Sequence, residues 1–372
     1  LPRHFPPADG DGPIDERRRR AFESALSSWI EKNQEHAVDW TVLRPIEMTT
    51  NLPRLELLDD GSILSTGDIT KRDEFTLTFR LDELGSRPTA LRLEVLPDER
   101  LPAGGPGRAY YEGRKGDFFL SELTATVDGA PVAFSAGSVD YGKIEIGSGD
   151  AKAENGYDGD GSTGWSTAGR EGERHQLVLN LAEPPAGTGA LQVVLLFERH
   201  FASSLGRFRI SATGSNRSAR ATELPAEIET LFARDSGTWT DGERAEIKRG
   251  FVRVAPELAE ARKPIDELRR EMPAPPTTMV LDERPADNPR KTFRHHRGEY
   301  LQTREEVTGG LPEFLAGRTA NQPRDRLSFA RWLASDENPL VARVVVNRAW
   351  DAYFGGGLVR SNGDFGTQSE AP

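Results

Sequence analysis

The middle of the chain alternates between apolar and polar residues with a period of two. Such alternation is typical of strands that bury one face, and turn residues such as Gly, Pro, Asp and Ser separate the runs. Because no helical pattern lies between them, the runs predict an antiparallel β-sandwich or jelly roll over residues 37–213. Asp128-Gly129 is a hairpin signal inside this region. The predicted strands cover residues 74–81, 90–96, 117–129, 143–147, 175–181, 191–198 and 206–213.

Helical spacing replaces this alternation on both sides of the predicted sandwich. Apolar residues recur every three or four positions over residues 13–34, 224–233 and 240–272, which predicts helices there. Asp241 is the expected N-cap of the third of these helices, although Arg244 stands where a capping box places Glu.

A proline-rich connector over residues 273–291 separates these helices from the last part of the chain. The pattern after it predicts a strand over residues 292–301 and then two helices. The last helix is expected to start at Asn338-Pro339 and to end at Gly355.

The pattern as a whole predicts a multidomain α+β protein. Residues 1–36 form a linker and a helix at the end of an upstream domain. Residues 37–213 form the sandwich, and residues 214–273 form a helical hairpin. Residues 274–372 begin a further, mostly helical domain that is truncated. Because the chain starts at Leu1 and stops in a turn-rich stretch, it is expected to be a fragment of a longer protein.

Composition narrows the function classes. The formal net charge of −11 argues against a nucleic-acid partner, because phosphates need a basic surface. The absence of cysteine excludes disulfides, thiolate zinc sites and CxxCH haem attachment in this chain. No apolar run approaches the roughly 18 residues that span a bilayer, and no signal peptide is visible.

A glycine-rich loop near residue 160 carries the candidate metal site. Asp158 and Asp160 offer hard oxygen ligands of the kind that calcium prefers. The spacing is not that of an EF-hand, because Thr163 and Gly169 stand where Gly and Glu are required. The alternative is a structural turn in which the aspartate side chains bond the backbone. The loop is expected at one end of the sandwich, between the strands over residues 143–147 and 175–181.

Aromatic side chains in turns provide a second kind of candidate site. Flat aromatic faces cover the CH groups of sugar rings while polar neighbours bind the hydroxyls. The alternative is ordinary packing in the core or at its rim. The aromatics concerned are Tyr110, Tyr111, Tyr141, Tyr157 and Trp165. The candidate ligand-binding set that we take from the loop and its surroundings is Tyr157, Asp158, Asp160, Trp165 and Arg170.

Other motifs give weaker signals. His295 and His296 are adjacent, so on a strand they point to opposite faces and cannot easily share a metal. The glycine-rich stretch over residues 104–113 lacks the P-loop lysine, and no dinucleotide-binding fingerprint is present. Carboxylates are plentiful, but the sequence does not pair any two of them for glycoside hydrolysis.

The C-terminal motifs resemble a known family. They are Arg297-Gly298-Glu299-Tyr300, Asn338-Pro339-Leu340, Val346-Asn347-Arg348-Ala349-Trp350, Phe354-Gly355 and Asp364-Phe365-Gly366. These stretches look like the start of the planctomycete PSD1 domain, a domain of unknown function. Residues 91–123 resemble the galactose-binding-like or discoidin-like sandwich that often precedes it. Glu299 departs from the family pattern, which usually has Asp at that position.

The resemblance covers about residues 37–372 and implies a periplasmic or cell-surface protein. It implies that any haem c lies in an upstream cytochrome-like domain, so that these residues hold no cofactor other than the candidate calcium. It implies no established reaction.

Two function classes follow. The first is a non-catalytic binding or scaffold protein whose sandwich recognises a polysaccharide or cell-surface glycan. The second is an enzyme or haem-linked redox component of polysaccharide degradation, with an active site formed by PSD1 and further domains. The lack of a complete catalytic constellation in the sequence favours the first class.

Overall fold

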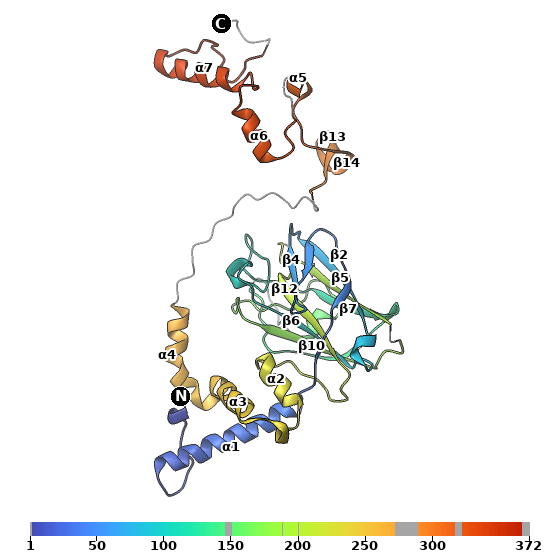
Figure 1. Ribbon diagram of the computed structural model, residues 1–372, viewed down its shortest axis with the longest axis vertical. Coiled ribbons are helices and arrows are strands. Elements are labelled where there is room, and N and C mark those ends of the chain that lie inside the picture. Colours follow the sequence, from blue (N-terminus) through green and yellow to red (C-terminus); the bar gives the residue numbers. More distant parts are fainter. Residues whose placement is uncertain are drawn as a thin grey trace. The chain divides into compact units, whose positions relative to one another are not determined.

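The computed structural model describes residues 2–145, 151–187, 189–199, 201–271, 289–316 and 322–366. Two compact units divide the chain, residues 1–276 and residues 277–372. The protein is a mixed α+β protein with antiparallel sheets, as the hydrophobic pattern predicts. Figure 1 shows both units.

The strands of the first unit pair into two antiparallel sheets. The first sheet has the order β3-β4-β12-β6-β10-β9, and β1 also pairs with β12; the second has the order β2-β5-β11-β7-β8. The bounds of the strands are β1 Thr41–Val42, β2 Pro45–Thr50, β3 Arg54–Leu57, β4 Ile63–Thr66, β5 Arg72–Arg80, β6 Ala90–Val95, β7 Glu122–Val127, β8 Ala130–Pro131, β9 Phe134–Val139, β10 His175–Leu181, β11 Ala190–Glu198 and β12 Arg207–Thr213.

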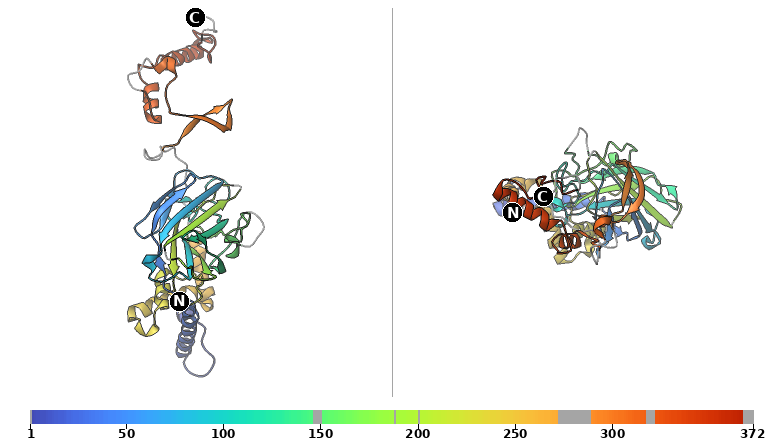
Figure 2. Two further views of the ribbon diagram at one scale, coloured as in Figure 1. Left: turned by 90° about the vertical axis from the view of Figure 1, so that its right-hand side faces the viewer. Right: turned by 90° about the horizontal axis from the view of Figure 1, so that it is seen from above.

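One apolar core lies between the two sheets and makes the arrangement sandwich-like. Alternate residues of β5, such as Phe75, Leu77 and Phe79, are fully buried, while their neighbours are more exposed. The corresponding residues of β11 and β12 complete the same core cluster. Figure 2 shows the two sheets from the side. The period-two pattern therefore arises because each of these strands buries one face in the core, as predicted.

Helices in the first unit come from both ends of the sandwich sequence and pack on one another. They are α1 Ile14–Gln34, α2 Ala226–Ala233, α3 Asp241–Val254 and α4 Ala259–Arg270. Phe22 of α1 contacts Phe251 of α3 edge to face, with the ring centroids 5.3 Å apart. Trp29 of α1 contacts Phe232 of α2 in the same way, at 5.2 Å. The helix before the sandwich and the helices after it thus share buried aromatic clusters.

A buried ionic cluster joins α2 to the outer face of the first sheet. Glu94 of β6 has no exposed surface and binds Arg209 (2.8 Å), Arg174 (2.8 Å) and Arg92 (3.3 Å). Arg92 also binds Glu229 of α2 at 2.8 Å. Burial opposes ionisation of Glu94, but these guanidinium groups outweigh it and hold its pKa at about 2.

Several details differ from the expectations drawn from the sequence. The N-cap of α3 is Thr240, not Asp241, and Glu243 completes its capping box, so that Arg244 is irrelevant to it. Pro256 follows the end of α3, so the expected helix over residues 240–272 is two helices. The expected strand over residues 117–129 is shorter, because only β7 joins the sheet ladder.

The expected strand over residues 143–147 is also not regular. Lys143 makes an isolated bridge to Thr167, and residues 144 and 145 belong to no strand. Residues 146 and 147 lie outside the described part of the chain. The strand that precedes the aspartate loop in the sheet is instead β9, which the pattern did not indicate.

The second unit contains a hairpin and three helices in its described residues. The expected strand over residues 292–301 is a hairpin of β13 Thr292–His296 and β14 Glu299–Val307, because Arg297 and Gly298 both adopt positive φ. The helices are α5 Glu313–Ala316, α6 Arg326–Leu333 and α7 Val341–Phe354. Gly355 ends α7 in the left-handed conformation, as expected. None of the described helices has the length and apolar character needed to cross a membrane.

We expect Glu94→Gln to lower the free energy of unfolding by about 3–5 kcal/mol at pH 7, because it removes the carboxylate that three arginines share. Glu229 alone then has to offset the buried charge of Arg92. Since the pKa of Glu94 is below its usual value, its contribution is complete above about pH 4.5 and is lost as the pH falls toward 2. Denaturant unfolding at pH 7, 5 and 3 should therefore show the gap between variant and wild type narrowing at pH 3.

The matched control is Glu198→Gln, which removes an exposed ion pair with Arg72 and should cost at most about 1 kcal/mol. Equal losses for the two variants would contradict the role assigned to the cluster.

Candidate functional site

The loops at one end of the sandwich form the candidate site. In the ladders, Val95 pairs with both His175 and Phe208, and Arg72 pairs with Glu198. The connections that follow β4, β6, β9 and β11 therefore meet at the same end. They cover residues 67–71, 96–121, 140–174 and 199–206. The aspartate loop lies at this end of the sandwich, where it was expected.

Both aspartates of the loop bond their own loop. Asp158 accepts from the backbone N–H of Asp160 (2.8 Å) and from the Thr163 hydroxyl (2.8 Å). Asp160 accepts from the backbone N–H and the hydroxyl of Ser162, at 3.0 and 2.7 Å. These contacts are those of the structural turn. Among the described residues, no group of three or more His, Cys, Asp or Glu side chains is arranged to hold a metal ion. The calcium site stays a prediction.

Trp165 is a core residue. Its side chain is fully buried, its indole N–H donates to the Tyr141 carbonyl (2.9 Å), and its ring contacts Phe118 edge to face. Its backbone exchanges two hydrogen bonds with Leu120. Gly164 permits this approach, because a Cβ there would lie 2.5 Å from the Leu120 carbonyl oxygen. The indole face is covered by protein and is not a surface for a sugar ring.

The other predicted ligand residues also have partners. Tyr157 is half-buried against Phe134, with the ring centroids 5.5 Å apart. Arg170 binds Glu173 (2.7 Å) and Glu223 (2.6 Å) and lies over the Tyr141 ring. Arg170 thus ties the end loops to the segment that leads to α2. Its role in ligand binding stays a prediction.

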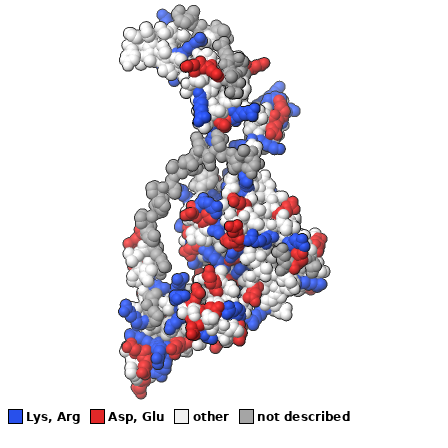
Figure 3. Space-filling model, in the orientation of Figure 1, with Lys and Arg blue, Asp and Glu red and all other residues white. Residues whose placement is uncertain are grey.

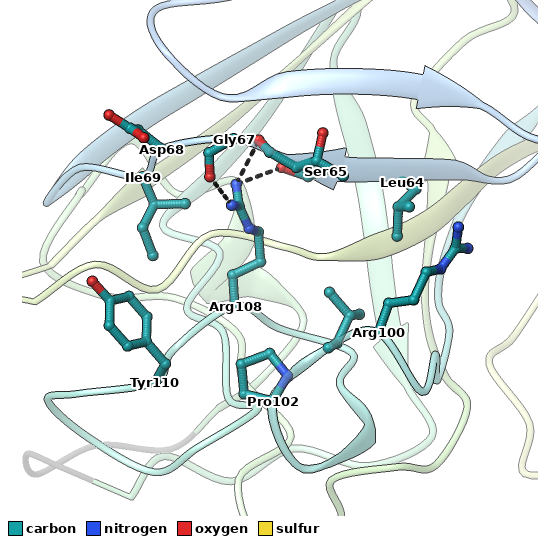
Figure 4. A pocket seen from close by; sticks show the side chains of 11 residues that line it. Leu64, Ser65, Gly67, Asp68, Ile69, Arg100, Pro102, Arg108 and Tyr110 are labelled. Atoms are coloured by element: carbon teal, nitrogen blue, oxygen red, sulfur yellow. Dashed lines mark hydrogen bonds between the residues drawn. The ribbon is translucent and has the colours of Figure 1, made fainter. Parts of the chain in front are cut away.

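A pocket among the end loops has polar and aromatic lining residues. Its volume is about 670 Å³, and its lining comes from residues 64–69 and from the long connection after β6. Figure 4 shows Tyr110 and Arg100 at opposite sides of the view, with Arg108 between them. We call this the main pocket. Its lining residues are Leu64, Ser65, Thr66, Gly67, Asp68, Ile69, Arg100, Leu101, Pro102, Arg108 and Tyr110.

Arg108 builds the wall of the main pocket. Its guanidinium donates to the Ser65 hydroxyl (3.0 Å) and to the carbonyls of Thr66 (3.1 Å) and Gly67. These bonds hold the turn between β4 and β5. Burial lowers the pKa of Arg108 to about 10, so the group is still a cation at neutral pH.

Tyr110 is held at the rim by a rigid base. The Gly107 N–H donates to the Gly116 carbonyl at 2.8 Å, and the Gly116 N–H donates to the Ala109 carbonyl at 2.7 Å. Ala109 is fully buried, while the next residue, Tyr110, keeps 47% of its surface exposed. The backbone of this loop is therefore held by hydrogen bonds while the Tyr110 ring lies at the pocket. A ring on such a backbone loses little conformational entropy when it contacts a ligand.

Sequence reasoning named Tyr110 as an aromatic face but missed the rest of the main pocket. Ser65 and Arg108 are distant in sequence and meet only because β12 pairs with both β4 and β6. The available signal is the pair of tyrosines in a Gly- and Pro-rich stretch, which indicates aromatic faces but does not identify Arg108 or Ser65.

The family motifs of the second unit hold the loop after α7. Asn347 is buried, and its side-chain amide bonds the backbone of Val359 in both directions and the side chain of Asn362. Asn338 accepts from the backbone N–H groups of Leu340 (2.9 Å) and Val341 (3.3 Å) at the start of α7. These residues have a structural role in the described chain.

Figure 3 shows how charge is distributed on one face of the molecule. Acidic and basic side chains are interspersed over the first unit on that face. The main pocket likewise combines both signs, since Asp68 lies in the same lining as Arg100 and Arg108.

We expect Trp165→Ala to lower the free energy of unfolding by about 3–5 kcal/mol, because it opens a cavity in the core. Thermal or denaturant unfolding measures the loss. Tyr111→Ala removes a ring that is 81% exposed and should leave the stability within about 0.5 kcal/mol. A Trp165→Ala protein as stable as the wild type would contradict the core role.

Glu122 should make stability depend on pH. Burial, and also the neighbouring Asp158 carboxylate, raise the pKa of Glu122 to about 6, so its protonated form is favoured in the fold and stability is lost as the pH rises through 6. Glu122→Gln should melt at a higher temperature than the wild type at pH 8, and the difference should vanish at pH 4.

The predicted calcium site is tested by adding calcium chloride to the wild-type protein in the same melts at pH 8. An unchanged melting temperature contradicts a calcium site.

The comparisons with known proteins agree with the C-terminal motifs. Residues 325–372 match the model of the PSD1 family, described as a protein of unknown function (DUF1553). The chain matches none of the curated proteins and none of the solved structures with which it was compared. The predicted likeness of the sandwich to galactose-binding modules stays a prediction. Residues 325–372 of this chain therefore carry the PSD1 family signature that the motifs after α6 predict.

Proposed function

We propose that this chain is an extracytoplasmic binding protein that holds a glycan in the main pocket of its sandwich. The observation that carries the proposal is the half-exposed Tyr110 ring at the rim of a 670 Å³ pocket. An aromatic face of this kind packs against the CH groups of a sugar ring, while nearby polar groups bind its hydroxyls. The aspartate loop, which contains Asp158 and Asp160, lies at the same end of the sandwich as the main pocket.

The polar lining supports a ligand rich in hydroxyls. Asp68 supplies acceptors and Arg100 supplies donors, and a sugar hydroxyl can serve either. Arg100 is oriented by two contacts of 2.8 Å with Asp98. The Arg108 bonds to the β4–β5 turn keep this lining in place before a ligand arrives, which lowers the cost of binding.

The same lining favours binding over hydrolysis. Cleavage of a glycoside by the common mechanism needs two carboxyl groups that face the bond. Among the described residues that line the main pocket, Asp68 is the single carboxylate. The location outside the cytoplasm is part of the same proposal and rests on the resemblance of the C-terminal motifs to the planctomycete family.

We expect Tyr110→Ala to weaken glycan binding by about 2 kcal/mol, or roughly 30-fold in Kd, because it removes the aromatic face. The measurement is retention on a glycan array, followed by calorimetry with the retained saccharides. Tyr110→Phe keeps the ring and is the matched control, which should bind nearly as well as the wild type. Unchanged binding by Tyr110→Ala would overturn the location of the site.

A further inference from the structure

A second, smaller pocket adjoins the main pocket. Its volume is about 270 Å³, and it shares Ile69 and Tyr110 with the main pocket. We call it the side pocket. The rest of its lining comes from the turn before β5, from the loop around Tyr111 and from the loop after β11, and consists of Thr70, Lys71, Tyr111, Glu112 and Ala202. Tyr110 therefore borders both pockets.

Tyr111 gives the side pocket its own aromatic face. Its ring is 81% exposed, more than that of Tyr110. Because the backbone bonds of Gly107, Ala109 and Gly116 hold the base of this loop, the two neighbouring rings are presented together. Two aromatic faces, each beside a pocket, fit successive sugar units of an oligosaccharide, whereas a single sugar would occupy only one of the two pockets.

Each pocket contains charges of both signs. Lys71 and Glu112 line the side pocket. Asp68, Arg100 and Arg108 line the main pocket, and the charge of Arg100 is already paired with Asp98. In either pocket, an anionic sugar unit would be attracted by the cation and repelled by the carboxylate. Neutral hydroxyls can donate to the carboxylate and accept from the cation at the same time. The lining therefore favours neutral sugar units over acidic ones.

We propose that the two pockets are adjacent subsites of one groove and that the ligand is a neutral oligosaccharide of two or more units lying across Tyr110. This inference rests on the proposed glycan-binding function. It adds that the affinity depends on chain length and that Tyr111 acts only on the unit in the side pocket.

The test uses calorimetry of the whole chain with glucose, galactose, mannose and xylose oligosaccharides, each from one to six units, and with the galacturonic acid series of the same lengths. The affinity of the best neutral series should rise about tenfold or more between one unit and three, and then level off as the groove is filled. Tyr111→Ala should remove that rise and leave the affinity for the single sugar unchanged. Tyr353→Ala is the matched control, because its ring is 85% exposed and lines neither pocket.

The outcomes separate this inference from the proposed function. If no saccharide of any length binds, the proposed function fails, and this inference fails with it. If a single sugar binds as tightly as six units, or if Tyr111→Ala binds long chains like the wild type, the two-subsite groove is wrong while glycan binding stands. Tighter binding of the galacturonic acid series would overturn the neutral ligand.

Discussion

The arrangement of the first unit depends on the buried carboxylate of Glu94. Three arginines from the first sheet and its edge surround it, and one of them, Arg92, also binds Glu229 of α2. Removing these charges from water is costly, and the cost is offset only when all partners are present together. The cluster therefore specifies which face of the sheet the helices cover. It also explains why helices from both ends of the sandwich sequence lie together, because α1 packs on the α2 that the cluster holds.

The ionic cluster around Glu94 lies on the face of the first sheet that the helices cover, and the main pocket is formed by the end loops instead. The connection after β6 begins in a strand that pairs with β10 and β12. It ends in β7, which pairs with β11 and β8, so the sheets fix both of its ends. The Arg108 bonds then join the loop after β6 to the turn after β4. A pocket that is formed by backbone ladders and a half-buried, hydrogen-bonded guanidinium needs little rearrangement to take a ligand. The position of Tyr110 is thus a consequence of the packing of the sheets.

The sequence predicts the parts of the fold that follow local rules. β5, β11 and β12 show clear alternation because they lie across the core, and the PSD1 motifs are contiguous in the chain. β3 and β4 are too short to show a period, and β9 reads FSAGSV, with little apolar alternation. Asp241 and Thr240 are both good cap residues, and only the position of Glu243 distinguishes them. Contacts such as that between Arg108 and Ser65 depend on strand order, which local patterns do not contain.

The difference between the predicted site residues and the main pocket has a single physical cause. Asp158, Asp160 and Trp165 were chosen for their chemistry, but a polar side chain in a turn is stabilising mainly when it satisfies its own backbone. Both aspartates do so, and the indole of Trp165 fills the core beneath them. These bonds and the buried ring stabilise the conformation of the loop, and a role of the two aspartates in ligand binding stays a prediction. Tyr110 follows a fully buried Ala109 and keeps half of its ring in solvent, so the backbone is constrained while the side chain is available. Exposure of the side chain on a constrained backbone, rather than residue type alone, therefore separates Tyr110 from the residues that stabilise this end of the sandwich.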